Sequence, residues 1–281
     1  MPDESNGSPF LVLNMVPEEK FSKLKKILSQ MKSVLVAYSG GVDSTFLLKV
    51  AKEVLGERVL AVTANSPTYP RSELKFSRRM AKYLKAKHLV IKTREFEDRQ
   101  FLKNSRKRCY FCKKELFNRL NKIAGKNNIN CVIDATNYSD RKDFRPGSLA
   151  KKQLGVRSPL EEAGLTKQDI RKLSKKLRIP TWNKPSLACL ASRIPYGINI
   201  NGEILNQIDK AECIIRSMGF KEVRLRHYNG LARIEVIKED IPRLIKMRRL
   251  IVDKLKSLGY NYITVDLEGY RMGSLNIGRQ I

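Results

Sequence analysis

The sequence contains a short glycine-rich segment whose residue types suit phosphate binding. Residues 39–44 read Ser-Gly-Gly-Val-Asp-Ser and lie between an apolar run, Val34–Tyr38, and a segment of helical periodicity, Thr45–Leu55. In a strand–loop–helix arrangement, glycines let the backbone approach a phosphate, and the N–H groups at the helix start point at the anion. The serine hydroxyls add donors, and Asp43 can hold a Mg²⁺ ion that bridges phosphates. The segment therefore predicts a phosphate-binding loop.

This loop is not the Walker loop, which requires the pattern GxxxxGK[ST]. Its SGGxDS pattern after a strand resembles the PP-loop of the ATP pyrophosphatase superfamily, whose members split ATP into an adenylated intermediate and pyrophosphate. In that chemistry an oxygen of the substrate attacks the α-phosphate, and AMP then becomes the leaving group for a nitrogen or sulfur nucleophile. The resemblance implies that the ATP-binding residues of the loop are Ser39, Gly40, Gly41, Asp43 and Ser44.

Polar residues also follow two further apolar runs, Val59–Ala64 and Cys131–Thr136. The crevice of a doubly wound fold opens at the carboxyl ends of its parallel strands. We therefore expect adenosine contacts from the ends of these two runs, at Thr63, Asn65 and Thr136.

The chain has five cysteines, an odd number that does not favour a disulfide framework. Cys109 and Cys112 form a CxxC pair flanked by Arg and Lys, and positive neighbours favour the thiolate, which is both nucleophile and metal ligand. Cys189 lies in a stretch rich in Pro, Gly and Ser. Cys131 and Cys213 fall in a strand run and a helical run, so we expect both to be small buried apolar residues.

Three cysteines suit metal or cluster binding if the fold brings Cys189 to the CxxC pair. A zinc site requires a fourth ligand, and the two histidines, His88 and His227, have no local ligand spacing. A [4Fe–4S] cluster held by three thiolates requires no fourth protein ligand, and its remaining iron can bind a group such as sulfide.

Several motifs together resemble the LarE family of ATP-dependent sulfur transferases, which make the nickel-pincer nucleotide cofactor of lactate racemase. The resemblance covers about residues 20 to 276 and rests on SGGVDS, RCYFCKKELF, DATNYSDRKDFRPG, PSLACLASRIPYG, RLRHYNGLARIEV and DLEGYRMGSLN. It implies a small nucleotide substrate, pyridinium-3,5-biscarboxylate mononucleotide, whose carboxylates are adenylated with ATP and converted to thiocarboxylates. It also implies a homo-oligomer, and it leaves the sulfide donor unknown.

The family divides by cysteine content. Some members carry only the cysteine matching Cys189 and give up its own sulfur, whereas others carry three and bind a [4Fe–4S] cluster. This chain has all three, so the resemblance favours the cluster type, with Cys109, Cys112 and Cys189 as cluster ligands and catalytic residues beside Asp43.

The resemblance also implies a substrate-phosphate site. Ser192 and Arg193 lie close after Cys189, and Arg224 and Arg226 alternate on one strand, where bidentate guanidinium contacts suit a phosphate. The expected acidic residues, which hold a cation or orient the substrate, are Glu212 and Glu235.

The elements that must position these residues alternate between strand and helix in the first part of the chain. Such alternation predicts an α/β fold with a doubly wound parallel sheet, followed by a smaller C-terminal α+β domain. The later part should contain a hairpin turning at Asn229-Gly230 and a helix over about 241–258. The predicted organisation is a flexible arm (1–17), a PP-loop domain (18–185) and a substrate and sulfur-transfer domain (186–281).

The 281 residues carry a formal net charge of +28, and 42% of them are hydrophobic. This composition is globular, and no apolar run reaches the ~18–20 residues that span a bilayer. The polar, acidic N-terminus is unlike a secretory signal, so a soluble cytoplasmic protein is expected. The positive charge attracts anions, or it simply marks a lysine-rich surface.

Two other functions fit parts of the pattern. A tRNA thiolation enzyme also combines a PP-loop with three cysteines, and the charge of +28 suits a nucleic acid. However, basic residues are spread along the chain without a dedicated RNA-binding module. A non-catalytic nucleotide or iron–sulfur carrier is the second alternative, and the intact Asp43 and loop serines argue against it.

Overall fold

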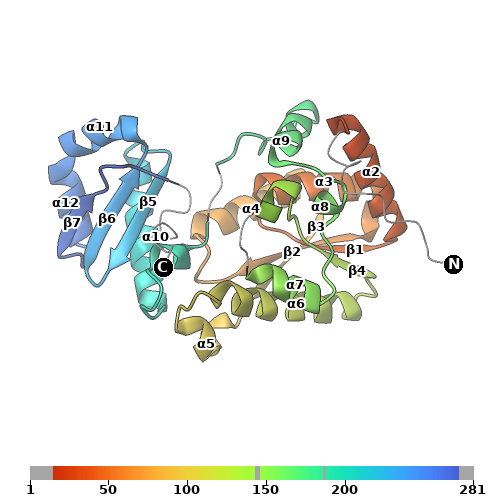
Figure 1. Cartoon of the computed structure of the whole chain (residues 1–281), viewed down its shortest axis with the longest axis horizontal. Helices are drawn as coiled ribbons and strands as arrows, with labels where there is room; N and C mark the ends of the chain where they lie inside the picture. Colours follow the sequence, from red (N-terminus) through yellow and green to blue (C-terminus); the bar gives the residue numbers. More distant parts are fainter. Residues whose placement is uncertain (1–14, 143–145, 186–187, 272–281) are drawn as a thin grey trace. The chain divides into compact units, whose positions relative to one another are not determined.

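The computed structural model describes the chain except for residues 1–14, 143–145, 186–187 and 272–281. Most of the predicted arm, 1–17, therefore lies outside the described residues, and helix α2 begins at Pro17. The chain forms two compact units (Figure 1). The first takes the chain up to Asn65, Ser72–Glu95 and the stretch from Cys109 to residue 186, and the second takes Ser66–Arg71, Phe96–Arg108 and the chain after residue 186.

The first unit is built on a four-stranded sheet in the order β3-β2-β1-β4, and every neighbouring pair of strands is parallel. The strands are β1 (Val34–Ala37), β2 (Val59–Asn65), β3 (Lys87–Lys92) and β4 (Cys131–Ile133). Strand β1 pairs with β2 and β4 and is buried on both faces, which explains its continuous apolar character. The predicted α/β fold with a parallel sheet is confirmed.

Two separate apolar clusters cover the two faces of this sheet. Val34 and Val36 pack into the cluster that contains Phe46 and Leu47, whereas Leu35 packs with Phe117 and the helix that carries it. Adjacent residues of β1 thus face opposite helical layers, as expected of a doubly wound fold. The helices of this unit are α2 (Pro17–Gln30), α3 (Val42–Leu55), α4 (Arg71–Tyr83), α6 (Arg108–Lys126), α7 (Gly147–Gln153), α8 (Pro159–Glu162) and α9 (Lys167–Lys176).

The second unit contains a three-stranded mixed sheet in the order β5-β6-β7. Strands β5 (Val223–Tyr228) and β6 (Leu231–Val236) form the predicted antiparallel hairpin, and β7 (Tyr262–Val265) pairs parallel with β6. Asn229 and Gly230 take φ values of 42° and 90°, and positive φ at both central residues is what a two-residue type I′ hairpin turn requires.

Four helices accompany this sheet within the described residues of the second unit. They are α5 (Arg99–Leu102), α10 (Gly202–Ser217), α11 (Ile241–Lys246) and α12 (Arg248–Lys256). The single helix expected over 241–258 is therefore wrong, because the chain breaks the helix at Met247. None of the helices described in either unit has the length and apolar character that a bilayer crossing requires.

Candidate functional site

The glycine-rich loop lies between β1 and α3, as predicted. Ser39 is exposed, and its hydroxyl lies 3.0 Å from the hydroxyl of Ser44, which also accepts from the Ser39 N–H at 3.3 Å. Gly41 is the N-cap of α3 and offers no side-chain cap to the first N–H groups of the helix. These N–H groups and the two hydroxyls form a donor-rich cradle, which is the arrangement that binds phosphate oxygens.

Gly40 can only be a glycine in this loop. Its φ is +72°, and a Cβ built there would lie 3.0 Å from both Cα and Cβ of Ser77 on α4. Its carbonyl oxygen accepts from Nζ of Lys184 at 3.2 Å, and the same ammonium lies 2.6 Å from the carboxylate of Glu73. Burial lowers the pKa of Lys184, while Glu73 opposes that shift. Lys184 thereby ties the phosphate loop to α4.

Asp43, in the first turn of α3, pairs with a lysine that the sequence analysis did not single out. Its Oδ2 lies 2.6 Å from Nζ of Lys167, the first residue of α9, and its Oδ1 is buried without a hydrogen-bond partner in the described part of the chain. Burial raises the pKa of Asp43, Lys167 opposes the shift, and the charge of Asp140 adds to it. A buried carboxylate oxygen without a partner, near a second carboxylate, fits the oxygen ligands that Mg²⁺ prefers.

The carboxyl ends of β1 and β4 meet where the connectivity of the sheet reverses, which is the usual position of a ligand crevice. Just beyond β4, the hydroxyl of Thr136 donates to Asp134 at 2.7 Å, and Asp134 also accepts from the hydroxyl of Ser158. The predicted Thr136 is therefore held in place next to the phosphate-loop strand.

The two residues predicted at the end of β2 differ in exposure. Asn65 is exposed at the last position of the strand. Thr63 is buried, donates its hydroxyl to the Tyr38 carbonyl at 2.8 Å, and lies 2.8 Å from Nε2 of His88. The Thr63 hydroxyl thus fixes the backbone that leads into the phosphate loop.

The cysteines of the expected cluster belong to different units. Cys109 and Cys112 are the second and fifth residues of α6, one exposed and one half-buried. Cys189 is the N-cap of the 3-10 turn Leu190–Arg193 in the second unit. Within the described residues, no group of three His, Cys, Asp or Glu side chains is placed to hold a metal ion. Three thiols are nevertheless the donor chemistry that an iron–sulfur cluster takes.

The other two cysteines were expected to be buried. Cys131 is half-buried against the core of the first unit, whereas Cys213 is exposed on α10. The expectation of burial is therefore wrong for Cys213, because it lies on a part of the α10 surface that the core does not cover.

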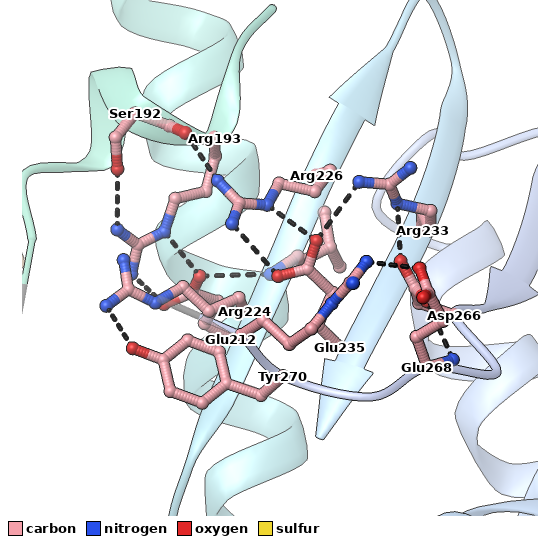
Figure 2. A network of polar contacts seen from close by, with 12 residues as sticks. Ser192, Arg193, Glu212, Arg224, Arg226, Arg233, Glu235, Asp266, Glu268 and Tyr270 are labelled. Atoms are coloured by element: carbon pink, nitrogen blue, oxygen red, sulfur yellow. Dashed lines mark hydrogen bonds and ion pairs between the residues drawn. The ribbon is translucent and has the colours of Figure 1, made fainter. Parts of the chain in front are cut away.

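A buried ion pair holds the Cys189 loop in place (Figure 2). The side chain of Arg193 is fully buried and binds the Glu212 carboxylate through Nε at 2.8 Å and Nη2 at 3.2 Å. Its third nitrogen donates to the carbonyls of Ala188 at 2.8 Å and Cys189 at 3.2 Å. Arg193 therefore determines the path of the backbone around Cys189.

A second buried pair supports the same loop from the hairpin. Arg226 binds the Glu235 carboxylate at 2.8 and 2.9 Å and donates to the carbonyl of Ser192 at 2.7 Å. The Ser192 hydroxyl in turn donates to the Cys189 carbonyl at 2.7 Å. Glu235 also pairs with Arg233, so the predicted acidic residues are engaged with arginines in this structure.

Arg224 differs from these two arginines because its hydrogen-bond partner in the described residues is neutral. Its Nη2 donates to the hydroxyl of Tyr270 at 2.9 Å, and its guanidinium lies over that ring. Burial, and then the charge of Arg193, lower the pKa of Arg224. Two neighbouring guanidinium groups beside the Ser192 hydroxyl form a positively charged place that suits an anion.

Several side chains that shape these sites are not indicated by the sequence motifs: Glu73, Lys167 and Lys184 at the phosphate loop, and Asn104 before the CxxC pair. The sequence does contain a signal for the position of Lys167. Thr166 and Asp169 form a capping box, which marks the start of α9 and makes Lys167 its first residue.

Comparisons with known proteins agree with the geometry of the loop. The asparagine synthase family matches residues 24–108. An uncharacterized protein of Synechocystis sp. is 40% identical over 261 residues, which cover 92% of this chain and 97% of that protein. An uncharacterized protein of Methanocaldococcus jannaschii is 33% identical over 260 residues, with 92% and 99% covered.

The pyridinium-3,5-bisthiocarboxylic acid mononucleotide synthase of Lactiplantibacillus plantarum is 36% identical over 258 residues, which cover 92% of this chain and 94% of that enzyme. A similarity that extends over nearly all of both chains includes the phosphate loop, the CxxC helix and the Cys189 loop. The chain therefore belongs to the LarE family of sulfurtransferases, within the PP-loop ATP pyrophosphatases.

Proposed function

We propose that this chain is an ATP-dependent sulfur transferase that converts the carboxylates of pyridinium-3,5-biscarboxylate mononucleotide into thiocarboxylates, releasing pyrophosphate and AMP. The observation that carries the proposal is the uncapped start of α3 beside the Ser39 and Ser44 hydroxyls and the buried Asp43. Family membership supports the substrate, because a relative of similar length is a synthase of the bisthiocarboxylic acid mononucleotide.

In the first step, a carboxylate oxygen of the substrate attacks the α-phosphorus of ATP, and pyrophosphate leaves. The N–H groups of the loop and the serine hydroxyls stabilise the charge that builds up on the departing phosphates. Asp43 holds the Mg²⁺ that accompanies ATP, and the ammonium of Lys167 becomes available to a phosphate oxygen. Asn65 and Thr136 contact the adenosine, and Thr63 fixes the backbone at Tyr38.

In the second step, a sulfur nucleophile attacks the acyl carbon of the adenylate, AMP leaves, and a thiocarboxylate forms. We assign Cys109, Cys112 and Cys189 as ligands of a [4Fe–4S] cluster, which when bound supplies a sulfide at its iron that lacks a cysteine. The alternative is transfer of the Cys189 sulfur itself. In either case, Arg193 and Arg226 fix the loop that presents Cys189.

We propose that the phosphate of the substrate binds at Arg224 and at the Ser192 hydroxyl, which would turn from the Cys189 carbonyl to donate to a phosphate oxygen. The donors of Arg193 and Arg226 that face Glu212 and Glu235 are already occupied, so these two pairs contribute rigidity to the site. Arg224, whose partner is a phenol, has donors left for an anion. A nucleotide phosphate placed there also offsets the repulsion between Arg224 and Arg193.

The two half-reactions allow a direct test. Asp43→Ala should abolish pyrophosphate release that depends on the biscarboxylate nucleotide. Cys189→Ala should retain pyrophosphate release but lose the thiocarboxylate, measured by mass spectrometry under anaerobic conditions. Cys213→Ala, at an exposed cysteine outside the set, is the matched control and should behave as the wild type. Unchanged turnover in Asp43→Ala would remove the loop from the mechanism.

The sulfur source is read from the same assay. Repeated turnover with intact protein supports the cluster, together with about four irons per chain after reconstitution. In the sacrificial route the Cys189 thiolate forms a thioester with the acyl carbon as AMP leaves, and β-elimination then breaks the Cβ–Sγ bond of Cys189. A single turnover that leaves the thiocarboxylate on the substrate and dehydroalanine at position 189 supports this route instead.

A further inference from the structure

Asn104 is a fully buried polar residue that holds the chain just downstream of the Cys189 loop. Its carboxamide Nδ2 lies 3.3, 2.7 and 2.9 Å from the carbonyl oxygens of Ile194, Pro195 and Ile198. The backbone carbonyl of Asn104 accepts from the Gly197 N–H at 3.2 Å. The carboxamide and the backbone carbonyl of Asn104 thus hold residues 194–198, a turn of the chain that begins directly after Arg193.

The backbone conformation of Asn104 restricts which residues can stand at this position. Its φ is +51°, in the left-handed region that asparagine tolerates better than most residues with a side chain. Asn104 follows the short helix α5, and the Leu102 carbonyl accepts from the Ile200 N–H at 2.9 Å. The segment before the CxxC helix and the segment after the Cys189 turn are therefore joined by backbone as well as side-chain hydrogen bonds.

The opposite end of the carboxamide contacts the start of the CxxC helix. Oδ1 of Asn104 accepts from Nη1 of Arg108 at 2.6 Å, and the Arg108 guanidinium lies 4.6 Å from the centre of the Tyr196 ring. Arg108 is the first residue of α6, and Cys109 is the next residue in the chain. Asn104 consequently bridges two segments that each adjoin a cysteine of the proposed sulfur site.

Arg108 is also a buried cation without a carboxylate partner in the described parts of the chain. The residue is 5% exposed, and its Nε has no hydrogen-bond partner there. Burying a charge is costly unless other groups compensate it, and the contacts that do so for Arg108 are the Asn104 carboxamide and the Tyr196 ring. The position of Arg108, and with it the start of α6, therefore depends on the side chain of Asn104.

From these contacts we infer that Asn104, acting through Arg108, is a positioning residue for sulfur transfer: it fixes the start of the CxxC helix to the segment that follows Cys189. The inference rests on the proposed function, and it concerns the second half-reaction alone. Asn104 makes no contact with the phosphate loop among the interactions of the described residues.

The test is Asn104→Gly, because glycine keeps the positive φ and removes only the side chain. The matched control is Asn128→Gly, whose φ is +52° and whose exposed side chain makes no hydrogen bond within the described residues. Hydrogen exchange of the full chain is the first readout. Asn104→Gly should raise exchange at least about tenfold in peptides covering residues 194–200 and leave those covering β1 unchanged.

The second readout separates the half-reactions. In Asn104→Gly, pyrophosphate release should stay within about twofold of wild type, while thiocarboxylate formation and the iron bound after reconstitution fall at least about fivefold. A merely structural role would lower both half-reactions together and reduce the midpoint of thermal unfolding of the chain. Asn128→Gly should match the wild type in every measurement.

Each outcome decides one question. Sulfur transfer at the wild-type rate in Asn104→Gly overturns the inference, and so does equal loss of both half-reactions. If the wild type itself shows no nucleotide-dependent pyrophosphate release, the proposed function fails. In that case unchanged exchange of residues 194–200 in Asn104→Gly would separately reject the positioning role, which the exchange data measure without any substrate.

Discussion

Nζ of Lys167 lies 2.6 Å from Oδ2 of Asp43, although the two residues are far apart in the sequence. The pair places a cation from the first turn of α9 against the carboxylate in the first turn of α3. Lys167 therefore lies at the carboxylate that would hold the metal ion in the proposed reaction, close enough for its ammonium to contact a phosphate there.

Replacing this lysine should weaken adenylation without unfolding the chain. Lys167→Met removes a charge-assisted contact to phosphate, which is worth about 1.5–3 kcal/mol. The rate of pyrophosphate release from the ATP-bound enzyme should therefore fall roughly tenfold to hundredfold. The control is Lys49→Met, since Lys49 forms an exposed ion pair with Glu53 on the same helix. Equal effects of the two substitutions would contradict a role for Lys167 at the phosphates.

The ionisation of Asp43 should oppose folding. Burial raises the pKa of this carboxyl in the folded chain, so its contribution to stability is fully present below the unfolded pKa of about 3.9 and is lost as the pH rises through the folded value. Asp43→Asn cannot ionise. Its free energy of unfolding relative to wild type should therefore increase from acidic to neutral pH in urea titrations. A difference that is independent of pH would show that burial of the charge is not costly.

Gly40 should tolerate no side chain, for two reasons that can be separated. Gly40→Ala incurs the left-handed backbone cost of about 1–2 kcal/mol and also a close contact with Ser77 on α4. Gly56→Ala incurs only the first cost, because Gly56 has a φ of +62° and nothing within 4 Å of its Cβ position. Chemical denaturation should show a larger loss for Gly40→Ala, and only that variant should lose pyrophosphate release. Similar losses of stability would mean that α4 moves aside.

The Arg193–Glu212 pair should be strongly coupled. Arg193→Met leaves the fully buried Glu212 carboxylate with only the partly exposed Arg216 as an ion-pair partner and should cost up to about 3–5 kcal/mol of unfolding free energy. The double variant with Glu212→Met should recover part of this loss, because both charges are then gone. Arg157→Met, at a more exposed pair with Glu162, should cost no more than about 1 kcal/mol. Additive losses in the double variant would contradict coupling through the pair.

The positive charge should not reflect a tRNA substrate. Filter binding of tRNA is expected to be weak at physiological salt and to fall further as salt rises. Pyrophosphate release should respond to the biscarboxylate nucleotide and not to tRNA. Tight tRNA binding accompanied by tRNA-stimulated pyrophosphate release would instead support the tRNA thiolation alternative.

The sequence predicted the local features of this molecule better than its distant pairings. The apolar run Val34–Tyr38 and the following SGGVDS predicted a buried strand and a phosphate loop, since both signals are contained in consecutive residues. The alternation of Arg224 and Arg226 correctly placed both on one face of a strand. Such patterns follow from the period of two in a strand.

Contacts between remote segments were not predictable from the pattern alone. Nothing local pairs Lys184 with Glu73, and nothing local indicates that Arg226 points at Glu235 and therefore has fewer donors left for a phosphate. The break at Met247 was also missed, because the apolar spacing continues through it. Tertiary packing decides these features, and a single sequence records it only indirectly.

The division of the chain has a practical consequence. Because Ser66–Arg71 and Phe96–Arg108 belong to the second unit, a cut near residue 186 would not excise that unit whole. A fragment starting there would lack the Thr68 carbonyl, which accepts from the Leu190 N–H at 2.8 Å, and would lack Asn104. Expression of isolated halves is therefore expected to give incomplete folds, and biochemical dissection of this enzyme is better done by point substitution than by truncation.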